Sequence, residues 1–232
     1  MKNNKVVLTY YYTGEADFWH TERPIIKKPD TLDFLVLRKS LAQFPDWDFH
    51  TLANEFEPNW DYTKITKPEG MTFFVHKFMA AKKWIEEHPE YEWIWIVDTS
   101  DTQMLQEPQM QKDIIYTGYD CWSRIRGRYQ SVKTLINGGF RKFKHSSFIH
   151  DSLRQWAQDP CYNCGVTGGH RDILLQFLAD LEELMLKYPA DLEMVTYNYL
   201  IFSKYKRKTS ICTTKLNNWV NDLSEGAWWR HK

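Results

Sequence analysis

The sequence predicts an open α/β sheet flanked by helices, formed by one domain that covers residues 1–232. Two observations support this prediction. A helix-like segment leads through a short turn into the apolar run Trp93–Val97, which is typical of a strand buried on both faces. Two carboxylates, Asp98 and Asp101, follow that run directly. Because open α/β sheets bind ligands at the carboxyl ends of their strands, we expect a polar site at this edge.

The first half of the chain alternates between strand-like and helix-like segments. Residues 5–12 are apolar and β-branched, then aromatic, which predicts a first strand. Residues 33–44 carry apolar side chains at helical spacing before Pro45, and residues 48–53 suit a second short strand. Residues 71–88 are again in helical register. Helix, turn, buried strand and acidic terminus together predict a βαβ-type unit.

The second half continues the alternation with a longer polar interruption. Residues 113–122 suit another strand, residues 123–133 read as a basic loop, and residues 148–157 suit a helix. A glycine-dense segment then precedes an amphipathic helix over residues 171–187, whose apolar side includes Ile173, Phe177, Leu181 and Leu184.

The glycine-dense segment has two interpretations. Gly165, Gly168 and Gly169 permit positive φ and close approach of the backbone to a ligand, and the following helix start offers free N–H groups to an anion. Alternatively, these glycines form a tight turn that lets the chain enter the helix. The segment alone does not decide between them.

The acidic pair also has two interpretations. Asp98 and Asp101 repel each other unless a cation or proton intervenes, and hard oxygen ligands suit Mg²⁺ or Mn²⁺ carrying a diphosphate. Asp, Thr and Ser also favour helix N-caps and Asx-turns, so the stretch Asp98-Thr-Ser-Asp101 is equally compatible with a structural turn.

Composition restricts the classes of function. Thirty basic and thirty acidic residues leave no net positive field, so binding to nucleic acid is not implied. The basic cluster of residues 204–208 suits a solvated face or, secondarily, an anion contact. Four cysteines, no apolar run long enough to cross a bilayer and no leader-like start favour a cytoplasmic location.

The pair Cys161 and Cys164 has the spacing of half a zinc site or of a redox dithiol. Zinc needs four ligands and the sequence offers no second pair, so small buried thiols are the competing interpretation.

Four elements in this order resemble the nucleotide-sugar-dependent glycosyltransferases of the GT-A type. They are the first strand with its polar turn (Thr9 to Gly14), the strand that ends in Asp98-x-x-Asp101, Asn163-x-Gly165-x-x-Gly168-Gly169, and Glu193-Met-Val-Thr-Tyr-Asn198. The Asp-x-x-Asp spacing is similar to that of the glycosyltransferase domains of collagen-modifying enzymes. The resemblance covers most of the chain and implies a Rossmann-like, open mixed sheet flanked by helices.

The resemblance implies a divalent cation, Mn²⁺ or Mg²⁺, that bridges the two phosphates of a nucleotide-sugar donor, most simply a UDP-sugar. Asp98 and Asp101 are the matching ligands. Many family members add a late His, and His231 is the only candidate after Asn198. Because His231 is one residue from the C-terminus, a frayed tail is the competing expectation.

The remaining site residues also follow from the resemblance. Donor and acceptor would contact Thr9, Tyr10, Tyr11, Asn54, Lys77, Asn163, Gly165, Gly168, Gly169 and Asn198. The nucleotide base would lie over the end of the first strand, and Lys77 would lie on the phosphate side. If the reaction inverts the anomeric centre, Asp191 or Glu193 would be the general base. No sequence motif identifies the acceptor, which is a glycan, a protein or another molecule.

Two other classes of protein are alternatives to a glycosyltransferase. Acidic strand ends with Mg²⁺ also serve enzymes of nucleotidyl or phosphoryl transfer, although no Gly-x-x-x-x-Gly-Lys-Ser/Thr sequence is present. The eleven Trp and thirteen Tyr residues would suit a non-catalytic carbohydrate-binding module. Such a module would not need the acidic pair and the glycine segment together.

Overall fold

A computed structural model describes residues 3–12, 31–55, 62–69, 71–99, 102–119, 155–156, 158–187, 193–213 and 227–231. Its elements, in chain order, are β1 (Lys5–Tyr11), α1 (Thr31–Leu41), β2 (Trp47–Ala53), β3 (Tyr62–Lys64), α2 (Phe73–Glu87), β4 (Trp93–Val97), β5 (Thr102–Met104), β6 (Ile115–Tyr119), β7 (Tyr162–His170), α5 (Arg171–Lys187), α6 (Glu193–Leu200), a π-helical turn (Ile201–Tyr205), a 3₁₀ turn (Lys206–Lys208), β8 (Thr209–Ile211) and β9 (Trp229–His231).

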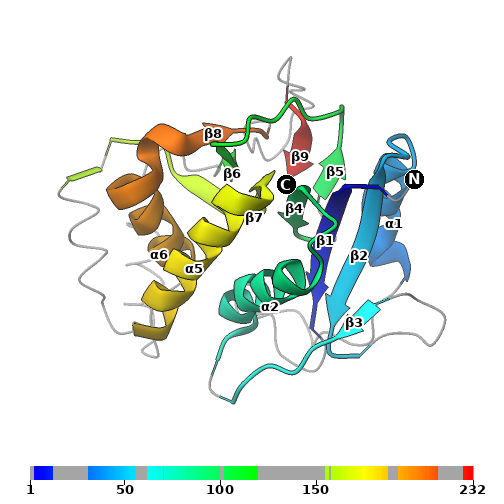
Figure 1. Ribbon diagram of the computed structural model, residues 1–232, viewed down its shortest axis with the longest axis horizontal. Coiled ribbons are helices and arrows are strands. Elements are labelled where there is room, and N and C mark those ends of the chain that lie inside the picture. Colours follow the sequence, from blue (N-terminus) through cyan, green and yellow to red (C-terminus); the bar gives the residue numbers. More distant parts are fainter. Residues whose placement is uncertain are drawn as a thin grey trace.

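The described residues form a seven-stranded sheet in the order β3-β2-β1-β4-β7-β6-β8 (Figure 1). β1 pairs in parallel with both β2 and β4, and β6 pairs in parallel with β8. β7 runs antiparallel to both of its neighbours, β4 and β6. The predicted fold class, an open mixed α/β sheet flanked by helices, is therefore confirmed.

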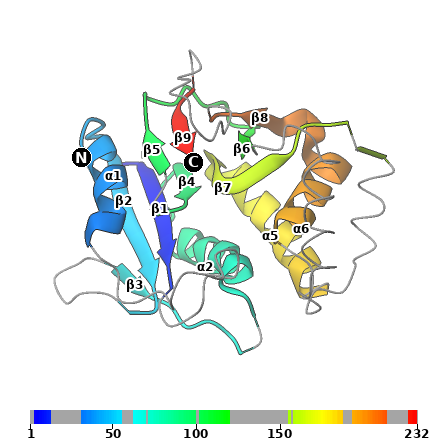
Figure 2. The same cartoon turned by 180° about the vertical axis from the view of Figure 1, so that it is seen from behind.

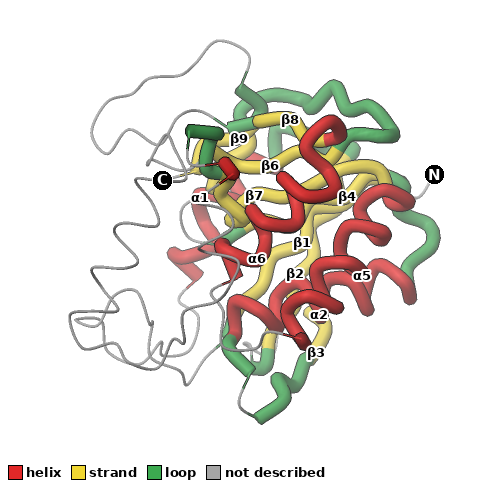
Figure 3. Tube along the Cα trace, turned by 90° about the vertical axis from the view of Figure 1, so that its left-hand side faces the viewer, coloured by secondary structure: helices red, strands yellow, loops and turns green. Residues whose placement is uncertain are grey.

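Helices cover both faces of this sheet. α2, α5 and α6 lie together on one face, and α1 lies on the other (Figures 2 and 3). Alternate residues of the central strands enter the two cores: Ile94 and Ile96 of β4 pack on the α2–α5 side, and Trp95 and Val97 pack on the α1 side. The burial of β4 on both faces agrees with its apolar sequence.

Most predicted elements have the predicted type. The segments predicted over residues 5–12, 33–44, 48–53 and 71–88 correspond to β1, α1, β2 and α2, while β4 and α5 have the predicted bounds. Residues 113–122 contain β6, and the helix predicted over residues 148–157 lies largely outside the described residues. The glycine-dense segment differs from both interpretations, because it is the nine-residue strand β7.

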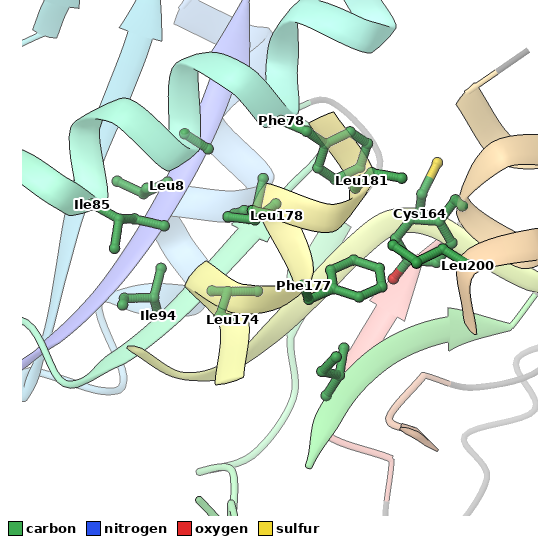
Figure 4. Packing of buried hydrophobic residues seen from close by; sticks show 14 of the residues in the cluster. Leu8, Phe78, Ile85, Ile94, Cys164, Leu174, Phe177, Leu178, Leu181 and Leu200 are labelled. Carbon is green, nitrogen blue, oxygen red and sulfur yellow. The ribbon is translucent and has the colours of Figure 1, made fainter. Parts of the chain in front are cut away.

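α5 packs against the core on the side of the sheet that α2 covers, through side chains spaced at helical intervals (Figure 4). Phe177 and Leu181 are fully buried, as predicted, whereas Ile173 and Leu184 are only partly buried and Leu174 and Leu178 take the inner positions. Leu174 and Leu178 belong to the same apolar side of the sequence, so the helical register is as predicted, with Ile173 and Leu184 at its margin. The Phe177 ring meets the rings of Tyr197 and Tyr205 edge to face, each with centroids 5.3 Å apart.

We expect Phe177→Ala to lower the free energy of unfolding by about 3–5 kcal/mol, because it empties a fully buried ring position between two helices. Urea unfolding would measure this loss. Leu186→Ala is the control on the same helix, because Leu186 is 55% exposed, and it should change stability by less than about 0.5 kcal/mol. Equal effects of the two substitutions would contradict the described packing of α5.

Candidate active site

The carboxyl end of β4 and the beginning of β7 meet at one edge of the sheet. Val97 is paired with Val166, and the backbone N–H of Asp98 donates to the carbonyl of Gly165 at 2.8 Å. β1 ends at the same edge, since Thr9 is paired with Val97. This edge is where the acidic residues were expected to face a ligand.

The two carboxylate oxygens of Asp98 have different partners. Oδ1 accepts a hydrogen bond of 2.9 Å from Lys77 Nζ, which also donates to the carbonyl of Cys164 at 3.3 Å. Oδ2 lies 3.5 Å from His231 Nε2. The Lys77 side chain is 6% exposed and that of Asp98 is 41% exposed, so a buried ammonium holds one oxygen of a carboxylate that solvent still reaches. The interpretation of Asp98 as a helix cap is wrong, because strand β5 follows it.

This pair is charged in the folded protein. Burial alone would raise the pKa of the Asp98 carboxyl, but the nearby Lys77 charge, together with His231, lowers that pKa well below its usual range. Burial alone would lower the pKa of Lys77, but the Asp98 charge raises it above its usual value. The site therefore holds a carboxylate and an ammonium at neutral pH.

His231 reaches Asp98 because the C-terminal strand β9 pairs with β5. In this antiparallel pair, His231 is opposite Thr102 and Trp229 is opposite Met104. Trp229 is fully buried, and its ring lies 5.3 Å from that of Trp95. The expectation of a frayed tail is wrong for this residue: His231 is 5% exposed and part of a strand.

Two threonines that the sequence analysis did not select shape the turn after β4. The Thr99 hydroxyl donates to the carbonyl of Tyr10 at 3.1 Å, and the Thr102 hydroxyl donates to the carbonyl of Asp98. Asp101 lies outside the described residues, but the next residue, Thr102, is paired with His231. Hydroxyl residues inside and beside the acidic motif are the signal that would have identified them.

Gly165 and Asn163 lie at the site edge of β7. The Asn163 side-chain oxygen accepts a hydrogen bond of 2.7 Å from the N–H of Gly165, which fixes the backbone beside Asp98. A Cβ on Gly165 would lie 2.5 Å from both Asp98 Oδ2 and His231 Nε2. The structure therefore brings these two residues next to the Asp98–His231 pair, where the resemblance placed a ligand.

Gly168 and Gly169 do not line this site. Gly168 is paired with Trp95, and a Cβ there would lie 2.5 Å from Cδ2 of that ring and 2.8 Å from the carbonyl of Ile94. Gly169 is farther along β7, where a Cβ would lie 3.0 Å from the carbonyl of Ile114. The structure thus gives both glycines packing roles within the sheet, and their contact with donor or acceptor stays a prediction.

The start of α5 is not an anion site at this edge either. β7 carries the chain to the opposite edge of the sheet, where His170 is paired with Trp93. There, the N–H of Arg171 donates to the carbonyl of Glu92 at 2.7 Å, and the N–H of Asp172 donates to His170 Nδ1 at 3.4 Å. The first N–H groups of the helix thus have partners within the protein.

Asn198 has a structural role within the fold. Its side-chain oxygen accepts from the N–H of Tyr162 at 2.8 Å, and its amide donates to the carbonyls of Tyr162 and Met194, both at 2.9 Å. Asn198 is fully buried, so these bonds attach α6 to the start of β7. Both amide hydrogens are used within the protein, and the contact with a sugar stays a prediction.

Thr9 and Tyr10 also support the edge from within. The Thr9 hydroxyl donates to the carbonyl of Val97 at 3.0 Å, and it is 1% exposed. The Tyr10 hydroxyl and His76 Nδ1 share a hydrogen bond of 3.0 Å, and Tyr10 is 8% exposed. The structure thus gives Thr9 and Tyr10 partners within the protein, and their contact with the nucleotide stays a prediction. Tyr11 and Asn54 are partly accessible at the ends of β1 and β2.

Lys77 and Glu193 belong to one buried charge cluster. Lys77 binds Asp98, which corrects the prediction that it binds a phosphate directly. Glu193 begins α6 and is 5% exposed. Its charge contributes to raising the pKa of both Lys77 and Cys164. Asp191, the other candidate general base, lies outside the described residues.

The residues present fit a hard divalent cation. Asp98 and His231 converge with one carboxylate oxygen and one imidazole nitrogen, which are donor types that Mn²⁺ accepts. Within the described residues no group of three His, Cys, Asp or Glu side chains gathers at one point. Cys161 and Cys164 are free, buried thiols, and burial raises the pKa of Cys164 to about 12, which keeps it protonated.

Comparisons with known proteins identify the fold. No protein-family model matches the sequence, and no curated protein matches it either. Among solved structures, the chain is similar to a glycosyltransferase involved in the glycosylation of the major capsid of PBCV-1. The match has a TM-score of 0.50 and 12% identity, and it covers 98% of this chain and 93% of that one.

The two chains share a fold. At this level of identity the match concerns architecture alone, and it places the present chain on a scaffold that a glycosyltransferase uses. In the part of the chain that the structure describes, no helix has both the length and the apolar character that crossing a membrane requires.

We expect Gly168→Ala to destabilise the protein by about 1–3 kcal/mol, because the added methyl group would overlap the ring of Trp95 in a closely packed core. Thermal or urea unfolding would measure the loss. A variant as stable as the wild-type chain would contradict the described packing of Gly168 against Trp95.

Lys77→Met is expected to lower stability by about 1–3 kcal/mol, because it leaves Asp98 Oδ1 without its buried hydrogen-bond donor. Lys82→Met is the matched control: the same helix carries Lys82, whose ion pairs with Glu86 and Glu182 are more exposed. Its effect should stay below about 1 kcal/mol. If both variants lost a similar free energy of unfolding in urea, the Lys77–Asp98 pair would contribute no more to stability than the exposed ion pairs of Lys82.

Proposed function

We propose that this chain is a metal-dependent glycosyltransferase of the GT-A type that transfers a sugar from a nucleotide-diphosphate sugar, most simply a UDP-sugar, to an acceptor. The convergence of Asp98 and His231 beside Gly165, at the carboxyl edge of β4, is the observation that supports it. The similarity in fold to a glycosyltransferase supports the same class. Nucleotidyl transfer and a carbohydrate-binding module receive no such support.

The cation would be held by Asp98 and His231, with Asp101 from the same turn as the third protein ligand. When bound, Mn²⁺ or Mg²⁺ supplies positive charge that stabilises the diphosphate leaving group. Asp98 is suited to this role because Lys77 takes Oδ1 and leaves Oδ2 directed toward His231. Lys77 thus acts on the site through Asp98, as a positioning residue.

Residues around this pair would orient the donor and acceptor. Gly165, held by the side chain of Asn163, adds no side chain beside Asp98 and His231. Tyr11 and Asn54 are at the ends of β1 and β2, on the side where the nucleotide would lie. Glu193 is the described candidate for a general base if transfer inverts the anomeric centre.

Asp98→Asn is expected to abolish metal-dependent UDP binding and transfer, because an amide oxygen carries no charge to offset the cation. Titration calorimetry with UDP, with and without Mn²⁺, would measure binding, and donor hydrolysis would measure turnover. The wild-type chain should bind UDP only weakly without the metal. Equal UDP affinity with and without Mn²⁺ in the wild type would overturn the proposal.

Because Asp98→Asn also removes the counter-charge of buried Lys77, the control is the double variant Lys77→Met/Asp98→Asn, which removes both charges. It should recover stability but not UDP–Mn²⁺ binding. If binding returned together with stability, Asp98 would be a structural residue.

A further inference from the structure

We propose that Gly165 is the residue that keeps the cation position accessible between Asp98 and His231. This inference rests on the proposed function, since it assigns a role to Gly165 within that metal site. Gly165 is in β7, and its carbonyl accepts the hydrogen bond from the N–H of Asp98. A backbone contact this close to a candidate ligand leaves little room for a side chain.

The position of a Cβ on Gly165 coincides with the point where the two candidate ligands converge. That atom would lie 2.5 Å from Asp98 Oδ2 and 2.5 Å from His231 Nε2, and closer still to His231 Cε1. A methyl group in that position would overlap both side chains, so one or both of them would have to move.

The neighbouring side chains have little freedom to yield to such a methyl group. Asp98 is held through Oδ1 by buried Lys77 at 2.9 Å. His231 is 5% exposed, and its strand is anchored by fully buried Trp229. Movement of either side chain would separate Oδ2 from Nε2, which are 3.5 Å apart. That separation opposes cation binding.

The role of Gly165 differs from that of the other described glycines in the sheet. Gly168 accommodates the ring of Trp95, and Gly118 faces the carbonyl of Asn163 at 2.7 Å. At Gly165 alone among these, the atoms that a Cβ would meet first are ionisable side chains from two other strand ends. Its backbone does not have the positive φ that would itself require glycine, so alanine is compatible with the local conformation.

The test is Mn²⁺ binding to the full chain, measured by electron paramagnetic resonance and by calorimetry with UDP, for Gly165→Ala and for a control, Gly169→Ala. Gly169 is in the same strand but far from the site, where a Cβ would lie 3.0 Å from the carbonyl of Ile114. Gly165→Ala should lower Mn²⁺ affinity about 10-fold or more per folded molecule, and its melting temperature would show the folded fraction at which the affinity is measured. Gly169→Ala should keep the Mn²⁺ affinity.

A double-mutant cycle separates crowding of the site from a general loss of structure. In a His231→Ala background the imidazole is gone, so Gly165→Ala should cause a much smaller further loss of Mn²⁺ affinity. Additive losses of Mn²⁺ affinity would overturn the inference. Wild-type affinity of Gly165→Ala for Mn²⁺ would overturn it while the proposed function stands. A wild-type chain that binds no Mn²⁺ would overturn both.

Discussion

The antiparallel pairing of β7 with β4 is the constraint on which the described site depends. Because β7 runs against its neighbours, it begins at the carboxyl edge of β4 and ends at the opposite edge. Its first residues therefore reach Asp98, and its last residues lead directly into α5. A parallel strand in this place would have brought the start of a helix, in place of Gly165, to the ligand edge.

This pairing requires residues of complementary size. Trp95 is fully buried in the centre of β4, and the strand beside it offers Gly168 at the paired position. Two large side chains could not share that position at the usual distance between paired strands, whereas Trp over Gly fills the space. The glycines that resembled a ligand-binding loop in the sequence thus serve the packing of the sheet, and Gly165, three residues earlier, is the one that faces the site.

The sequence was sufficient to predict the helices and strands that have a strong periodic pattern. It was insufficient for short strands that form only by pairing with a distant segment. β4 and α5 have the predicted bounds because burial on both faces and a helical stripe leave local signals. β5 and β9 have only three residues each, so no periodicity reveals them, and their pairing joins positions 102–104 to 229–231. His231 was accordingly expected to fray, although the structure holds it beside Asp98. The structural role of Asn198 was missed for a related reason. The sequence alone does not show whether an Asn side chain bonds the backbone of a distant strand or a sugar.

The buried charges connect the stability of the fold to the proposed chemistry. Lys77 comes from the middle of α2, Asp98 from the end of β4 and Glu193 from the start of α6, so three elements contribute to one cluster. Burying an ion costs several kcal/mol unless a partner compensates for it, and both the ion pair with Lys77 and the partial exposure of the Asp98 side chain reduce that cost. The divalent cation proposed above would meet a carboxylate that this ion pair already keeps ionised and that is still partly exposed, so the interaction that stabilises the fold also prepares the proposed metal ligand.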